Sequence, residues 1–176
     1  MISDRYVLTA AHCVSDSDTL KAKDPKHLGI GYGNEVNLID IYNHGRVKID
    51  KIFVHPLYNV STKDTTHDIA IVRLEEPINF DSENTVRPAC LLQENLNEKM
   101  KNYGHVTGTG WGSTQVMNFN YITRQWSGYK ASLQLKEATF KDVSHTSKIC
   151  AENPNLICIA SITPGESVCK GDSGGK

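Results

Sequence analysis

Short runs of β-prone residues, separated by turn residues, recur along the whole chain. The run Ile69–Leu74 is almost entirely apolar, which is expected of a strand buried on both faces. Val47–Val54 mixes alternation with an apolar end, and Ala131–Ala138 alternates apolar with polar residues. No amphipathic helix longer than two or three turns is apparent. This pattern predicts an all-β chain that folds as a sandwich or a barrel.

The length and the charge narrow the class of protein. The chain has 176 residues, which is enough for one sizeable domain or two small ones, and 39% of them are hydrophobic. A polar stretch follows Pro88, so we expect a β unit over 1–88, a connector over 89–103 and a second β unit over 104–176. The net charge of −1 argues against a nucleic acid or an anionic membrane as partner. No apolar run approaches the ~20 residues of a membrane-spanning helix.

The cysteines suggest an oxidising compartment. There are five of them, Cys13, Cys90, Cys150, Cys158 and Cys169, and none of the spacings fits a zinc module. We therefore expect no metal and no cofactor. An odd number means that at least one cysteine has its partner outside the chain or has none. The start of the chain lacks the features of a signal peptide, which alone indicates the cytosol. The sequon at Asn59 adds slight support for secretion.

Three short motifs carry groups that together could perform nucleophilic catalysis. They are Thr-Ala-Ala-His-Cys ending at Cys13, Asp68-Ile-Ala, and Gly171-Asp-Ser-Gly-Gly. A serine hydroxyl needs a base to become a nucleophile, and histidine titrates in the right range to act as that base. A carboxylate can hold the imidazole in the required tautomer, and glycines leave room for N–H groups that stabilise an oxyanion.

Each motif also has a simpler explanation. An aspartate before an apolar strand is usually a turn residue, a histidine beside a cysteine is more often a packing residue, and Gly/Ser/Asp clusters are usually loops. His67, beside Asp68, could compete for the role of base. We interpret His67 as a loop residue because the Thr-Ala-Ala-His-Cys motif favours His12 as the base. The order His, Asp, Ser at wide separations strengthens the catalytic interpretation.

With these motifs the chain resembles the trypsin/chymotrypsin family over essentially its whole length. Further motifs match in the family's order, namely Ser3–Cys13, His55–Asn59, Arg87–Cys90 and Thr109-Gly-Trp-Gly112. The resemblance implies two six-stranded Greek-key β-barrels, both incomplete in this chain, with the active site between them. It implies a serine endopeptidase that hydrolyses polypeptide substrates through an acyl-enzyme, and protein protease inhibitors as possible partners.

The resemblance also assigns roles to residues. His12 is the expected general base and acid, Asp68 its orienting carboxylate, and Ser173 the nucleophile. The N–H groups of Gly171 and Ser173 are expected to form the oxyanion hole. Asp172 is expected to pair with the amino group that activation cleavage creates. Ser167 is expected at the base of the S1 pocket, where a neutral residue favours a chymotrypsin-like or elastase-like preference over a trypsin-like one.

The same resemblance implies the cysteine pairing. Cys150 is expected to pair with Cys158, Cys13 with a partner upstream and Cys169 with a partner downstream. Cys90 lies where the family often tethers an upstream segment, which implies a secreted zymogen.

The chain departs from the family's pattern in several places. It begins just before the histidine motif, without the activation site, and ends at Lys176, where the family usually has proline. The calcium-loop carboxylates are not evident: Glu35 and Asp40 are present, but His44 stands where a second glutamate is expected. Two hypotheses remain open, a secreted endopeptidase of which this is an incomplete part, and a non-catalytic truncated product or decoy homologue. We expect the 176-residue chain by itself to be inactive and unstable.

Overall fold

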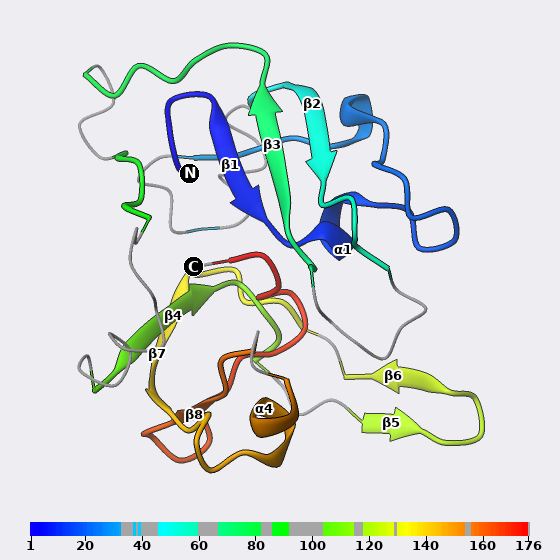
Figure 1. Ribbon diagram of the computed structural model, residues 1–176, viewed down its shortest axis with the longest axis vertical. Coiled ribbons are helices and arrows are strands. Elements are labelled where there is room, and N and C mark those ends of the chain that lie inside the picture. The colour runs from blue at the N-terminus through cyan, green and yellow to red at the C-terminus, as the bar shows by residue number, and fades with distance from the viewer. Residues whose placement is uncertain are drawn as a thin grey trace. The chain divides into compact units, whose positions relative to one another are not determined.

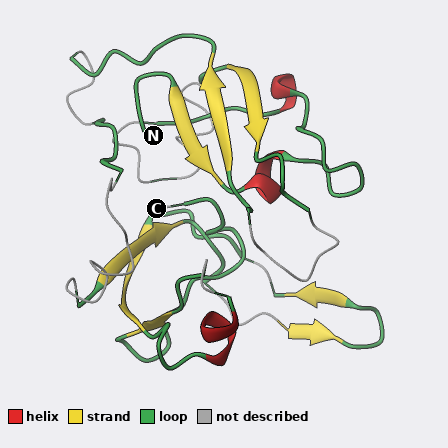
Figure 2. Ribbon diagram, in the orientation of Figure 1, coloured by secondary structure: helices red, strands yellow, loops and turns green. Residues whose placement is uncertain are grey.

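The computed structural model describes residues 1–32, 37, 39, 46–59, 67–81, 86–91, 104–114, 118–128, 130–153 and 156–175. The chain forms two compact units, Met1–Gln93 and Glu94–Lys176. Strands predominate among the regular elements, and the few helices are short (Figure 2). The all-β prediction is therefore confirmed. The predicted connector 89–103 falls mostly outside the described residues.

The first unit is built on a three-stranded antiparallel sheet with the order β1-β3-β2 (Figure 1). Its strands are β1 (Tyr6–Thr9), β2 (Ile49–Val54) and β3 (Ala70–Leu74). The short helix α1 (Ala11–Val14) follows β1 directly, and the 3-10 turn η1 (Pro25–His27) comes next. Thr9 is paired with Ala70. The end of β1 therefore lies beside the start of β3, although about 60 residues separate them in sequence.

The central strand β3 is buried on one face only. Ala70, Val72 and Leu74 are buried, whereas Ile71 and Arg73 between them are partly exposed. The expectation of burial on both faces is therefore wrong. Arg73 explains the difference, because its guanidinium forms an ion pair with the exposed Asp50 carboxylate at 2.5 Å. That pair keeps the outer side of the strand in contact with water.

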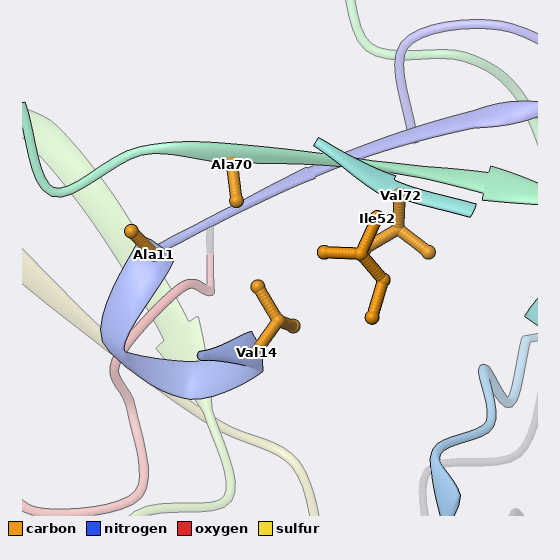
Figure 3. Packing of buried hydrophobic residues seen from close by; sticks show 5 residues of the cluster. All are labelled: Ala11, Val14, Ile52, Ala70 and Val72. Carbon is orange, nitrogen blue, oxygen red and sulfur yellow. The ribbon is translucent and has the colours of Figure 1, made fainter. Parts of the chain in front are cut away.

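The core of the first unit anchors α1 against the sheet. Ala11, Val14, Ile52, Ala70 and Val72 form one buried cluster (Figure 3). Positions i and i+3 lie on the same face of a helix, so Ala11 and Val14 face the core together. The residue that follows Ala11, His12, is left exposed. Burial of two small apolar side chains thus presents the histidine to solvent at the end of β1.

The second unit contains another three-stranded antiparallel sheet, with the order β4-β7-β8, and a separate hairpin. The sheet strands are β4 (Val106–Gly110), β7 (Lys136–Asp142) and β8 (Ile159–Ser161). The hairpin strands are β5 (Asn118–Asn120) and β6 (Gln125–Ser127), and the helix α4 (Lys148–Glu152) precedes β8.

The strand predicted over Ala131–Ala138 is only partly correct, because β7 begins at Lys136. The buried Ser132 explains the shift. Its N–H donates to the carbonyl of Trp111 at 3.1 Å, and its hydroxyl donates to the carbonyl of Gln134 at 2.6 Å. The first bond ties the start of the alternating run to the segment after β4, and the second is a local bond within the run. Only the last residues of the run are left for the sheet.

Candidate active site

The first unit brings His12 and Asp68 into direct contact. Asp68 Oδ2 lies 2.6 Å from His12 Nδ1, and Asp68 Oδ1 accepts the backbone N–H of His12 at 2.9 Å. The side chains are 46% and 25% exposed. Both oxygens of the Asp68 carboxylate therefore contact His12, and the two contacts together fix the orientation of the carboxylate relative to the ring. This geometry is the one expected if Asp68 orients His12 as a base.

Sheet register explains why two residues 56 positions apart meet. His12 follows β1 by three residues and Asp68 precedes β3 by two, and these strands pair antiparallel with Thr9 opposite Ala70. The end of one strand and the beginning of its antiparallel neighbour lie at the same edge of the sheet. The two motifs therefore lie together because of strand pairing.

The contacts of the imidazole define its tautomer. Because Nδ1 faces a carboxylate that can only accept, Nδ1 carries a proton. In the neutral ring Nε2 is then an acceptor, and it lies 3.5 Å from Cys13 Sγ. Partial burial, with a smaller contribution from the Asp68 charge, raises the pKa of the Cys13 thiol. The thiol is therefore neutral at physiological pH. In the neutral imidazole, the lone pair that a general base requires is on Nε2.

Ser173 lies in the second unit on a tightly turned, exposed loop. Gly171 has φ 99° and Gly174 has φ 75°, in the region that favours glycine. The N–H of Asp172 donates to the carbonyl of Cys169 at 3.0 Å, and the N–H of Gly175 donates to the carbonyl of Asp172 at 3.1 Å. Glycine on either side of Asp172-Ser173 thus permits two consecutive turns that project the serine to the surface.

The Asp172 carboxylate is bound by backbone amides. Its Oδ1 accepts the N–H of Gly112 at 2.8 Å, and its Oδ2 accepts the N–H of Cys169 at 2.9 Å. A Cβ atom at Gly110 or at Gly112 would overlap this carboxylate. The part that these two glycines play in placing Asp172 was not predicted from the sequence. The signal was present in the Thr109-Gly-Trp-Gly112 motif.

Two cavities border the serine loop within the second unit. One has a volume of about 760 Å³ and is lined by residues that include Ser167, Val168 and Asp172. The other, of about 380 Å³, is lined by Trp111, Ser173 and Gly174 among others. Ser167 is exposed, and its hydroxyl donates to the carbonyl of Val168 at 3.0 Å. The predicted specificity residue therefore lines a cavity large enough for a side chain or a small ligand.

The structure also places the predicted cysteines and the sequon. Cys150 and Cys158 form a disulfide with a Cα–Cα distance of 6.1 Å, as the resemblance implied. Cys90 and Asn59 are exposed, and Cys13 and Cys169 are partly buried. The predictions on Glu35, Asp40, His44 and Lys176 fall outside the described residues.

Comparison with known proteins establishes the family. The sequence model of the trypsin family, described simply as "Trypsin", matches residues 1–175. The chain belongs to the trypsin family. It is a trypsin-like serine protease domain.

Several known proteins resemble the chain over 99% of its length. Phenoloxidase-activating factor 1 of Holotrichia diomphalia is 28% identical, and the chain spans 48% of that protein. The CLIP domain-containing serine protease HP8 of Bombyx mori is 30% identical, with 47% of it spanned. Trypsin of Phaedon cochleariae is 29% identical, with 61% of it spanned. The chain thus spans about half the length of the curated relatives it matches.

Two other features are absent from the described part of the chain. Among those residues, no group of three or more His, Cys, Asp or Glu side chains could hold a metal ion. Of the described helices, none has the length and the apolar character needed to cross a membrane.

Proposed function

We propose that this chain carries the catalytic groups of a serine endopeptidase that cleaves polypeptides through an acyl-enzyme. The observation that supports this most directly is the 2.6 Å contact between His12 Nδ1 and Asp68 Oδ2, with the second carboxylate oxygen on the His12 amide. A carboxylate held in this way sets the tautomer that a general base needs. The chain belongs to the trypsin family and has Ser173 in a Gly-Asp-Ser-Gly-Gly motif. Ser173 is therefore the nucleophile that we assign to the His12–Asp68 pair.

The chemistry follows from these roles. Ser173 Oγ attacks the carbonyl carbon of the scissile peptide bond, while Nε2 of His12 takes the hydroxyl proton. The Asp68 carboxylate stabilises the imidazolium that results. When the tetrahedral intermediate collapses, His12 returns the proton to the leaving amine, and the acyl group remains on Ser173. Water then attacks the acyl-enzyme with His12 again as base, which releases the acid and regenerates the serine.

The backbone N–H groups of Gly171 and Ser173 are the proposed oxyanion hole. They belong to the turn whose two glycines have positive φ. Donors held there cost no reorganisation when negative charge develops on the carbonyl oxygen. We further propose that Asp172 pairs with the amino group formed by activation cleavage.

The biological setting is inferred from the family and from the cysteines. We propose a secreted zymogen whose exposed Cys90 joins the chain to an upstream segment by a disulfide. The relatives that match include a phenoloxidase-activating factor and a CLIP domain-containing serine protease. Protein protease inhibitors are proposed as additional partners, and Asn59 as a glycosylation site.

A fluorophosphonate probe tests the proposed reaction. In the naturally expressed full-length protein after activation, we expect the probe to label Ser173 covalently. Ser173→Ala is expected to abolish labelling, and His12→Ala to slow it by several orders of magnitude because the base is lost. Mass spectrometry of the labelled peptide identifies the residue. An activated wild-type protein that folds but takes up no label would point instead to a non-catalytic homologue.

Substrate preference is a separate expectation. Glu137, Glu166 and Asp172 line the same cavity as Ser167. Ser167 is a neutral residue, so at the predicted base of the S1 pocket it offers a lysine or arginine side chain no countercharge. We therefore expect kcat/KM to be higher for peptides with Tyr, Leu or Ala before the scissile bond than for those with Arg. The measurement compares kcat/KM across a panel of peptides that differ only in the residue before the scissile bond. Faster cleavage after Arg would reject the assignment of Ser167.

A further inference from the structure

The backbone just before Asp68 has an unusual conformation. His67 has φ 64°, and only two other non-glycine residues in the described ranges, Leu20 and Arg124, have positive φ. Side chains with a Cβ rarely adopt this left-handed conformation, because it carries a steric cost. A residue held there next to a functional group needs surrounding contacts that keep it in place.

His55 supplies such contacts on both sides of Asp68. Its backbone N–H donates to the carbonyl of Ile69 at 3.1 Å, and its ring stacks on that of His67 with the centroids 4.7 Å apart and the planes 18° apart. The N–H of Ile69 donates to the carbonyl of His67 at 2.7 Å, which closes a tight turn over Asp68. One residue therefore contacts both sequence neighbours of the aspartate.

The His55 ring is itself held in place. Its Nδ1 accepts the N–H of Leu57 at 3.2 Å, and its carbonyl accepts the N–H of Tyr58 at 2.9 Å. Tyr58 packs against the buried cluster of the first unit. The stacking face that His55 presents is thus anchored through a turn to the core, whereas His67 is exposed. The order of contacts runs from the core to Tyr58, to His55, to His67 and then to Asp68.

We propose that His55 and His67 are positioning residues, whose stacked rings hold the left-handed backbone at His67 so that Asp68 presents both oxygens to His12. His67 has a structural part in the site and does not act as the base. The proposal gives the Asp68 carboxylate a support independent of strand β3. As a statement about catalysis it rests on the proposed endopeptidase activity.

Two substitutions of His55 distinguish the effect of its stacking on His67 from the effect of its hydrogen bond with Leu57. His55→Gln keeps an acceptor for the Leu57 amide but removes the aromatic face, and His55→Phe keeps the face but removes the acceptor. In the naturally expressed protein we expect His55→Gln to lower kcat by about tenfold with KM nearly unchanged, since about tenfold corresponds to only ~1.4 kcal/mol of misalignment. His55→Phe is expected to retain most of kcat. His27→Ala, an exposed histidine of η1, is the control and should behave as wild type.

A double-mutant cycle tests the link to the backbone. Glycine adopts positive φ without the Cβ cost. In a His67→Gly background, His55→Gln should therefore lose most of its effect, which gives a coupling of up to about tenfold. An undiminished effect would mean that His55 acts by another route. A kcat loss with His55→Phe and none with His55→Gln would show that the hydrogen bond matters and the stack does not.

Proton NMR separates this proposal from the proposed function. We expect the Nδ1 proton of His12, hydrogen-bonded to Asp68, to resonate at low field, and its detection requires no turnover. In the Ser173→Ala protein, which is inactive by design, we expect this resonance to weaken or shift with His55→Gln and to persist with His55→Phe. A resonance unchanged in both variants would overturn the positioning role whether or not the protein is a protease. Its loss with His55→Gln alone would support the role even if wild type proved inactive.

Discussion

Asp68→Asn is expected to lower kcat by about three to four orders of magnitude, with little change in KM. The backbone N–H of His12 donates to Asp68 Oδ1, so the amide oxygen of the asparagine takes that position. Its NH2 group then faces His12 Nδ1, which must become the acceptor. The proton moves to Nε2, and the ring can no longer accept a proton from Ser173. The magnitude is the one known for this substitution in the family's best-studied example.

The control for Asp68→Asn is Asp50→Asn, in the same unit. The Asp50 carboxylate also pairs with a cation, Arg73, but its side chain is 41% exposed and lies on the outer side of the sheet. Exposed ion pairs contribute little to stability, so we expect kcat to change less than twofold. Steady-state kinetics over a range of pH compares the two variants. A loss of less than tenfold with Asp68→Asn would contradict the role of the carboxylate in orienting His12.

Gly112→Ala is expected to lower kcat by about a hundredfold or more, and Gly110→Ala should have a similar effect. A Cβ at either position would overlap the Asp172 carboxylate, which accepts hydrogen bonds from Gly112 and Cys169. The carboxylate must then move, and the next residue along the chain is Ser173. Displacing a single oxyanion donor can cost about 10²–10³ in kcat. The rate of fluorophosphonate labelling measures the same displacement without a peptide substrate.

Gly108→Ala is the matched control, two residues before Gly110 in the same strand. Its Cβ would lie 3.1 Å from the edge of the Phe140 ring and far from Asp172, so only a side chain has to adjust. We expect less than a tenfold change in labelling rate. Thermal unfolding is followed for all three variants to separate displacement of the loop from loss of folding. Equal labelling rates for Gly112→Ala and Gly108→Ala would show that the Asp172 contacts do not position the serine.

Much of the first unit could be predicted from its sequence because the local signals agree. The apolar runs around Leu8, Ile52 and Val72 lie in the three strands of the sheet. The error at β3, the supposed burial of both its faces, arose because apolar content does not reveal where the Arg73 ion pair lies. In the second unit the run Ala131–Ala138 had the correct period, but Ser132 used its hydrogen-bonding groups elsewhere. Periodicity describes which residues share a face and does not reveal competing hydrogen bonds.

The sequence by itself determined the family and the identity of the candidate residues, because their motifs are short, local and ordered. It also provided the glycines on which the turns around Asp172 depend, since only backbone without a Cβ adopts those angles freely. Tertiary structure alone decided the contacts between distant segments. The pairing of β1 with β3 sets His12 against Asp68, folding places Gly110 and Gly112 against Asp172, and the turn after β2 brings His55 to the ring of His67. Such contacts depend on strand register and on packing between residues far apart in sequence, which no local pattern encodes.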